Sequence, residues 1–145
     1  MSSDPTQLVP NDLMGASFPL RGANAGNGTP GTTVSITDAT EKDLTENGPF
    51  TGNNRPGLLQ GLRLVWNAAG TAQGVIQIFD KDSAAGGKLV ASIVVGEAAP
   101  AQGKAIDIKF ATPRRTASAA DSFRIKGYAN VGTVLVTVDG YYSPG

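Results

Sequence analysis

Acidic side chains are the residues of this sequence best placed to do chemistry. Four gather in one polar segment and two more lie in a Gly-rich turn, namely Asp38, Glu41, Asp43, Glu46, Asp80 and Asp82. Carboxylate oxygens bind calcium, and paired carboxylates hydrolyse glycosidic bonds. Neither group has the spacing of an EF-hand loop, and the acids fall mostly in predicted turns or on polar strand faces. We therefore expect solvated or turn-stabilising carboxylates, with no metal site, cofactor or catalytic pair.

The absence of histidine and cysteine limits the chemistry further. The 145 residues include no His and no Cys, which excludes a Ser-His-Asp triad, a thiolate nucleophile and a zinc–thiolate site. The 12 Lys and Arg residues balance 12 Asp and Glu residues, so there is no basic excess to attract nucleic acid. No apolar run approaches the length of a membrane span. We expect a protein that is not an enzyme and binds no nucleic acid, membrane or small-molecule substrate.

A glycine-rich segment, Gly26-Asn-Gly28-Thr-Pro-Gly31, has the G-x-G-x-x-G spacing of dinucleotide-binding loops. That motif needs a strand before it and a helix after it, because the helix N-terminus holds the pyrophosphate. Here no strand precedes the motif, Pro30 interrupts it, and a strand-like run follows. The segment therefore favours a flexible loop over a cofactor site.

Aromatic residues leave two interpretations open. Trp66, Tyr128, Tyr141 and Tyr142 can form a platform on which sugar rings stack. Alternatively, Trp66 belongs to the core and the C-terminal tyrosines lie at a subunit contact, where Tyr is favoured.

Alternation of apolar and polar residues is the main structural signal, because successive side chains of a strand point to opposite faces. The alternating runs are residues 33–37, 62–66, 75–79, 89–95, 106–110, 123–126 and 133–138. In the run at 89–95, we expect Leu89, Ala91, Ile93 and Val95 to share one face. The best helix candidate, residues 40–45, is a single polar turn. The pattern predicts an all-β fold, an antiparallel two-sheet β-sandwich or jelly roll of about seven to eight strands with an extended N-terminal arm.

The N-terminal residues differ in texture from the rest of the chain. Residues 1–32 contain few apolar side chains, and residues 22–31 are dominated by Gly, Ala, Asn and Pro. Such a segment cannot build its own core, so it is either disordered or orders against a partner. We predict an arm at residues 1–32 and a sandwich domain at residues 33–145.

Three strand-and-turn segments resemble small β-sandwich virion proteins of tailed bacteriophages. They are residues 62–66 (LRLVW), 74–90 (GVIQIFDKDSAAGGKLV) and 133–142 (TVLVTVDGYY), and the resemblance covers residues 58–142. Proteins of this type are commonly capsid decoration (cement) proteins on the outside of the icosahedral head, often trimers, or parts of head fibres.

The resemblance implies a structural function for this chain. It implies a decoration protein that binds the major capsid protein as a homotrimer and stabilises the head. The protein would be made in the host cytoplasm and reside on the outer capsid surface of the virion. The alternative is a carbohydrate-binding module or a receptor-binding component of a head fibre or tail.

Five residues are the candidate contact sites under this interpretation. Phe18, Leu20 and Arg21 are the expected anchors of the arm on the capsid, and Tyr141 and Tyr142 are expected near a subunit interface. Deleting residues 2–24 should then leave the sandwich folded and abolish capsid binding.

Overall fold

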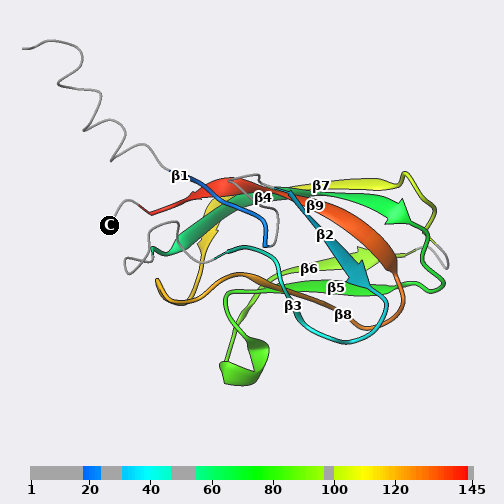
Figure 1. The fold of residues 1–145 in the computed structure, drawn as a ribbon, viewed down its shortest axis with the longest axis horizontal. Helices are drawn as coiled ribbons and strands as arrows, with labels where there is room; N and C mark the ends of the chain where they lie inside the picture. The colour runs from blue at the N-terminus through cyan, green and yellow to red at the C-terminus, as the bar shows by residue number, and fades with distance from the viewer. Residues whose placement is uncertain (1–17, 24–30, 47–54, 97–99, 144–145) are drawn as a thin grey trace, which may run out of the picture.

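Alternating apolar and polar residues form strands that pair antiparallel in two facing sheets (Figure 1). The computed structural model describes residues 18–23, 31–46, 55–96 and 100–143, which hold nine strands, one 3-10 helix and no α-helix. The elements are β1 (Phe18–Pro19), β2 (Gly31–Ile36), β3 (Lys42–Asp43), β4 (Gly57–Ala68), β5 (Gly74–Phe79), the 3-10 helix (Ser83–Ala85), β6 (Leu89–Val95), β7 (Ala105–Arg115), β8 (Arg124–Gly127) and β9 (Gly132–Tyr142). The predicted two-sheet sandwich is confirmed, with nine strands in place of seven to eight.

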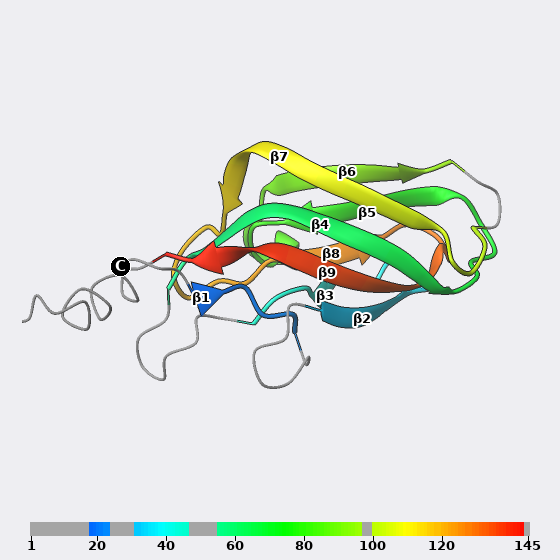
Figure 2. The ribbon, with the colours of Figure 1, turned by 90° about the horizontal axis from the view of Figure 1, so that it is seen from above.

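The strand order is that of a jelly roll. One sheet runs β2-β9-β4-β7, with β1 beside the far end of β9, and the other runs β3-β8-β5-β6. Every pairing between described strands is antiparallel. Among the described strands β2 and β7 are therefore the edges of the first sheet and β3 and β6 those of the second. Strands β6 and β7 lie on the same side of the sandwich, as the view from above shows (Figure 2).

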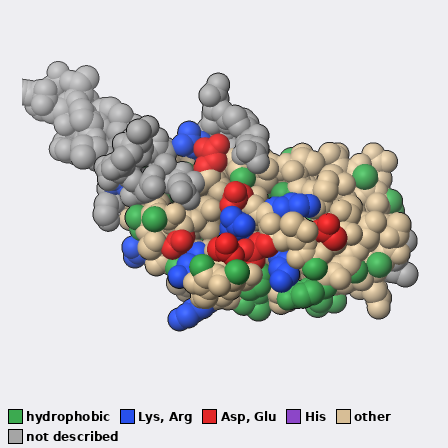
Figure 3. All heavy atoms as spheres, turned by 60° about the horizontal axis from the view of Figure 1, so that its bottom comes forward, with side chains coloured by type: hydrophobic (Ala, Val, Ile, Leu, Met, Phe, Trp, Pro, Cys, Tyr) green, Lys and Arg blue, Asp and Glu red, His purple; other side chains and the backbone are tan. Residues whose placement is uncertain are grey.

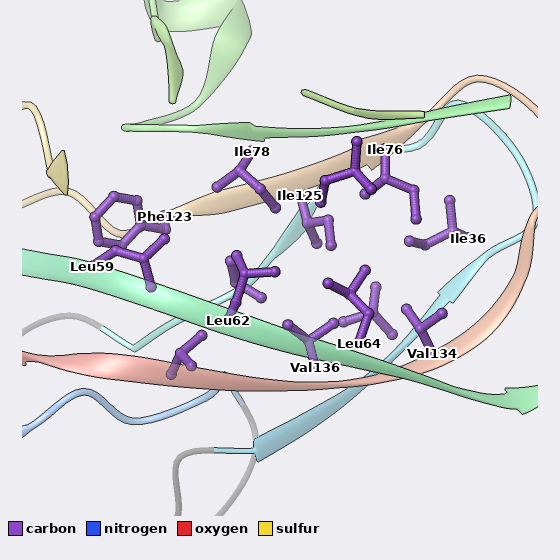
Figure 4. Packing of buried hydrophobic residues seen from close by; sticks show 14 of the residues in the cluster. Ile36, Leu59, Leu62, Leu64, Ile76, Ile78, Phe123, Ile125, Val134 and Val136 are labelled. Atoms are coloured by element: carbon purple, nitrogen blue, oxygen red, sulfur yellow. The ribbon is translucent and has the colours of Figure 1, made fainter. Parts of the chain in front are cut away.

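The core lies between the two sheets. Leu64 and Val136 from the first sheet point toward Ile76 and Ile125 from the second sheet (Figure 4). The inward positions alternate with outward polar ones, so that each strand contributes one face to the core. Complete burial of each aliphatic side chain stabilises the fold by about 1.5–3 kcal/mol. This packing is the main source of stability.

Trp66 belongs to this core, which was one of its two predicted positions; the other was an exposed platform for sugar rings. Its side chain is fully buried, and the indole Nε1 donates a hydrogen bond to the Val131 carbonyl at 2.6 Å. A buried indole N–H needs such a partner, because an unpaired polar group in the interior costs free energy.

Register shifts interrupt the strict alternation at three places in the described strands, one of them between Trp66 and Ala68 in the β4–β9 pair. In β4 the pairing with β7 shifts between Leu59 and Gly61, where a Cβ on Gly61 would lie 2.5 Å from the Ile108 carbonyl oxygen. The pairing of β5 with β6 shifts between Ile78 and Phe79, which sets Leu89 opposite Phe79. Leu89 is 51 % exposed, so the expectation that it shares the inward face of Ile93 was wrong.

The loop between β5 and β6 has the turn chemistry that its sequence predicts. Asp80 Oδ1 accepts a hydrogen bond from the Lys88 amide at 2.7 Å, and Asp82 Oδ1 caps the 3-10 helix through the Ala84 amide at 2.9 Å. Gly86 ends the helix with a φ of 89°, a left-handed conformation that favours glycine. These two aspartates therefore stabilise a turn.

The candidate polar turn at residues 40–45 contains a short strand instead. Strand β3 pairs with β8, with Lys42 opposite Ile125 and Asp43 opposite Arg124. Leu44, the next residue, is completely buried. A two-residue strand shows no alternation, so the sequence pattern could not reveal it.

The described part of the predicted arm belongs to the sandwich. Strand β1 pairs with the end of β9, and the Leu20 amide donates to the Gly140 carbonyl at 3.1 Å. Leu20 is only 1 % exposed, and Gly22 forms a bridge with Thr45. The predicted boundary at residue 33 also falls inside β2. Residues 18–23 and 31–32 are thus sandwich residues, and residues 1–17 and 24–30 of the expected arm lie outside the described residues.

The buried position of Leu20 predicts a large effect on stability. We expect Leu20→Ala to lower the free energy of unfolding by about 2–5 kcal/mol, because it leaves a cavity between the sheets. Phe18→Ala, two residues earlier at an exposed position, should cost less than half as much. Urea unfolding of both variants measures the difference. Equal losses would show that Leu20 is not part of the core. Deleting residues 2–24 should likewise destabilise the sandwich, in contrast to the expectation from the sequence.

Candidate functional site

The outer face of the second sheet carries the most exposed apolar side chains of the described residues. Val94 is 72 % exposed and Leu89 is 51 % exposed, both on edge strand β6. On the neighbouring strand β5, Val75 lies opposite Val94 and Phe79 opposite Leu89. Exposed apolar groups that cluster on one face mark surfaces that bind other macromolecules. This set of residues, with Tyr128 just beyond β8, is called the outer apolar face below.

Tyr128 adds an aromatic ring with polar neighbours to this face. The ring is 55 % exposed, its hydroxyl donates to Gln77 Oε1 at 2.6 Å, and the Lys126 ammonium lies 5.5 Å from its centroid. The hydrogen bond and the cation–π contact hold the ring in place. Figure 3 shows this side of the molecule, with hydrophobic side chains toward its lower margin and charged side chains gathered in the middle.

The charged group is centred on Arg124 of β8. Its Nη1 contacts Asp43 Oδ1 at 2.5 Å, and its Nε lies 3.4 Å from Glu41 Oε2. Glu41 Oε2 also accepts a hydrogen bond from the Ser83 amide at 3.1 Å. The guanidinium therefore joins β3 to β8, and Glu41 connects both to the 3-10 helix. The group fixes three neighbouring elements relative to one another.

Two open hollows of about 480 Å³ flank the Asp43–Arg124 pair. One is lined by acidic, hydroxyl and alanine side chains together with Arg124, namely Ala23, Asp43, Thr45, Glu46, Asp82, Ala120, Asp121, Ser122 and Arg124. The other lies between β2 and β3 and is lined by Thr32, Thr33, Val34, Ser35, Glu41, Lys42, Asp43 and Arg124. Both are polar depressions in the surface, with no apolar interior to enclose a small molecule.

The acidic cluster of the sequence does not come together as one site. Asp38 accepts from the Thr40 amide at 2.9 Å, and this bond lowers the pKa of the Asp38 carboxyl. Glu41 and Asp43 contact Arg124, whereas Glu46 contacts Arg21. Among the described residues no three acidic groups are close enough to hold a metal ion. These four carboxylates thus have structural partners, Arg124 being shared by two of them.

The structure brings the two predicted contact sets together at one end of the first sheet. Phe18 lies opposite Tyr142 in the β1–β9 pair, and Tyr141 is half-buried next to it. Arg21 Nε contacts Glu46 Oε2 at 3.2 Å. Sequence reasoning treated these as two separate sites, since Arg21 and Tyr142 are 121 positions apart in the chain.

Two of the five predicted contact residues are not surface residues. Leu20 packs in the core, and Tyr142 is 2 % exposed, with its hydroxyl donating to the Glu46 carbonyl at 2.8 Å and accepting from the Arg21 amide at 3.3 Å. Both side chains are thus buried within a single copy of the chain, and their assignment to a capsid contact and a subunit interface stays a prediction. Phe18 remains exposed, and whether it contacts a partner stays a prediction, as it does for Arg21 and Tyr141.

The aromatic platform suggested by the sequence is not formed. Trp66 and Tyr142 are both buried, and Tyr141 lies on the first sheet, away from Tyr128 after β8. Sequence reasoning instead missed the outer apolar face. Val94 could have been found, because it alternates with the inward Ile93 and Val95, whereas the bulge at Phe79 concealed Leu89.

Comparison of the sequence with protein-family models gives no match, and a search of curated proteins gives none either. Within the described residues there is no helix with the length and apolar character needed to cross a membrane. The surfaces of the molecule are therefore the basis for assigning a function.

The buried hydroxyl of Tyr142 predicts a pH-dependent effect. Burial raises the pKa of Tyr142, so the folded state keeps this proton at pH values where the unfolded chain ionises. The resulting stability is complete below about pH 10 and is lost as the pH rises through the higher folded-state pKa. We expect Tyr142→Phe to cost about 1 kcal/mol at neutral pH through its lost hydrogen bonds, and less above pH 10. Denaturant unfolding at several pH values measures this, and a constant difference between the proteins would contradict it.

Proposed function

We propose that this chain is a structural virion protein, a capsid decoration protein that binds the outer surface of an icosahedral phage head. The outer apolar face is the observation that carries the proposal, because Leu89 and Val94 present aliphatic side chains to solvent on a rigid sheet. Such a face suits a large protein surface better than a small ligand, which needs a concave, largely apolar pocket.

The fold is compatible with a structural protein of a virus, although it does not distinguish this function from carbohydrate binding. Jelly rolls form viral capsid proteins and also lectins, so the architecture suits both the proposed function and its main alternative. The resemblance of residues 58–142 to phage virion proteins favours the first. Many copies on one head multiply weak contacts through avidity, and a protein that binds the assembled shell in preference to free subunits stabilises that shell.

Binding to capsids stripped of the protein tests the proposal. We expect the unchanged protein to co-sediment with such capsids and Val94→Glu to bind about tenfold or more weakly, because the contact would bury an unpaired carboxylate. Leu135→Glu is the matched control, since Leu135 is an exposed aliphatic residue on the first sheet. Absence of binding by the unchanged protein at saturating concentration would refute the proposal. Equal binding by both variants would move the contact away from the outer apolar face.

Tyr128 favours one alternative, a carbohydrate-binding or receptor-binding module. Its exposed ring, with Gln77 and Lys126 beside it, offers a stacking surface and polar groups for hydroxyls. A glycan array tests this alternative. Binding that is lost in Tyr128→Ala and kept in Leu135→Glu would support it over the decoration protein, and an array without hits would remove it.

A further inference from the structure

One edge of strand β7 has no partner among the described residues. One side of β7 pairs with β4, whereas no described strand pairs with its other side. None of its 11 residues is buried. Figure 2 shows β7 at the margin of the first sheet, above the equally free edge of β6. Long exposed edges are templates for pairing with another strand.

The backbone groups on this edge can be assigned from the pairing with β4. The Trp66 amide donates to the Lys104 carbonyl at 2.8 Å and the Trp66 carbonyl accepts from the Gly103 amide at 2.9 Å, so the backbone groups of Trp66 point toward the chain that enters β7. Direction alternates along an antiparallel strand. The N–H and C=O groups of Ile106 and Ile108 therefore point to β4, and those of Asp107 and Lys109 point away from it. No described residue accepts from or donates to the outward groups.

In the part of the chain that the structure describes, the sandwich is also open on this side. The described apolar residues that pack on the core yet stay partly exposed come from β6 and β7, namely Val90, Ala91, Ile106, Ile108 and Phe110. The interior is thus incompletely covered between β6 and β7. A second strand added to β7 would cover its inward side chains and satisfy its backbone at the same time.

The charges on the outward side chains identify the added strand. We propose that β7 pairs antiparallel with β7 of a second copy of this chain, about a two-fold axis at Ile108. In this register Asp107 lies opposite Lys109 of the second copy, and Lys109 opposite its Asp107. Each pair exchanges two backbone hydrogen bonds, because these are the residues whose groups point outward. Ile106 then lies opposite Phe110 of the second copy.

The neighbouring registers place like charges together. A two-fold axis at Asp107 places the two Asp107 residues opposite each other, and an axis at Lys109 places the two Lys109 residues opposite each other. Like charges directly opposite each other destabilise a strand pair. Only the axis at Ile108 alternates the signs. Within the first sheet Asp107 already contacts Arg63 at 3.3 Å, so the joined sheet would carry Arg63, Asp107 and Lys109 of the second copy in one row.

The length of the contact is limited by the strand itself. The pairing of β7 with β4 is irregular between Lys109 and Arg114, and Pro113 has no N–H to donate. Only residues 106–110 can therefore pair, which predicts a dimer that dissociates on dilution. The trimer that the resemblance implies would need two different complementary surfaces, whereas the edge of β7 complements itself.

Light scattering after gel filtration, over a dilution series, tests the pairing. We expect the full chain to approach twice its monomer mass of 14.8 kDa at high concentration. Asp107→Lys and Lys109→Asp should each raise the dimer dissociation constant about tenfold or more, since each variant creates a like-charge contact that occurs twice about the axis. The double swap Asp107→Lys with Lys109→Asp restores opposite charges and should recover the dimer.

Lys88→Asp is the matched control, because Lys88 is an exposed lysine in the β5–β6 loop, and it should leave the dimer intact. Circular dichroism of each variant checks that the sandwich is folded. A monomer at every concentration, or a trimer, would overturn the proposal. A dimer that the single variants do not weaken would also overturn it, because its contact would lie elsewhere. The proposal does not depend on what the outer apolar face binds.

Discussion

The packing of two sheets through alternate side chains is the constraint on which the rest of this molecule depends. Leu64 and Val136 meet Ile76 and Ile125 between the sheets, and the strict alternation of a strand then fixes which side chains face outward. A shift of one residue in any central strand would turn its aliphatic face to solvent. The outer face of each sheet is therefore a rigid surface, and substitutions of its side chains leave the packing of the core unchanged.

That alternation explains which features could be predicted from the sequence. The long central strands β4, β5 and β9 show it clearly, and they carry enough information to give two antiparallel sheets. The two-residue strands β1 and β3 cannot show it, so β3 was read as a turn. Bulges interrupt the period in a way that only the partner strand reveals, which is why Leu89 was placed on the wrong face. Local residue patterns are enough to predict the long strands, whereas bulges and very short strands depend on pairing between residues that are far apart in the sequence.

The same limit explains why the burial of Leu20 could not be predicted. Leu20 stands in a polar, glycine-rich stretch, and local composition therefore assigned it to an arm. In the fold it fills the space at the end of the sandwich, where Tyr142 and the Arg21–Glu46 ion pair surround the segment. A few anchored residues suffice to hold a polar segment on a sheet, because its backbone bonds supply the remaining contacts. Burial of single residues in such stretches depends on tertiary contacts that sequence spacing does not contain.

The two surfaces proposed for binding lie on different parts of the sandwich and bind through different interactions. The outer apolar face lies on the second sheet, pointing away from the core, and offers side chains, whereas the edge of β7 lies in the plane of the first sheet and offers backbone groups. Pairing along β7 would therefore leave the outer apolar face accessible in both copies. Two such faces in one dimer would double the valency toward a repeating surface, and a weak individual contact would then be held by avidity. Self-association through β7 and attachment through the outer apolar face would reinforce each other in this geometry, since each bound copy raises the local concentration of the next.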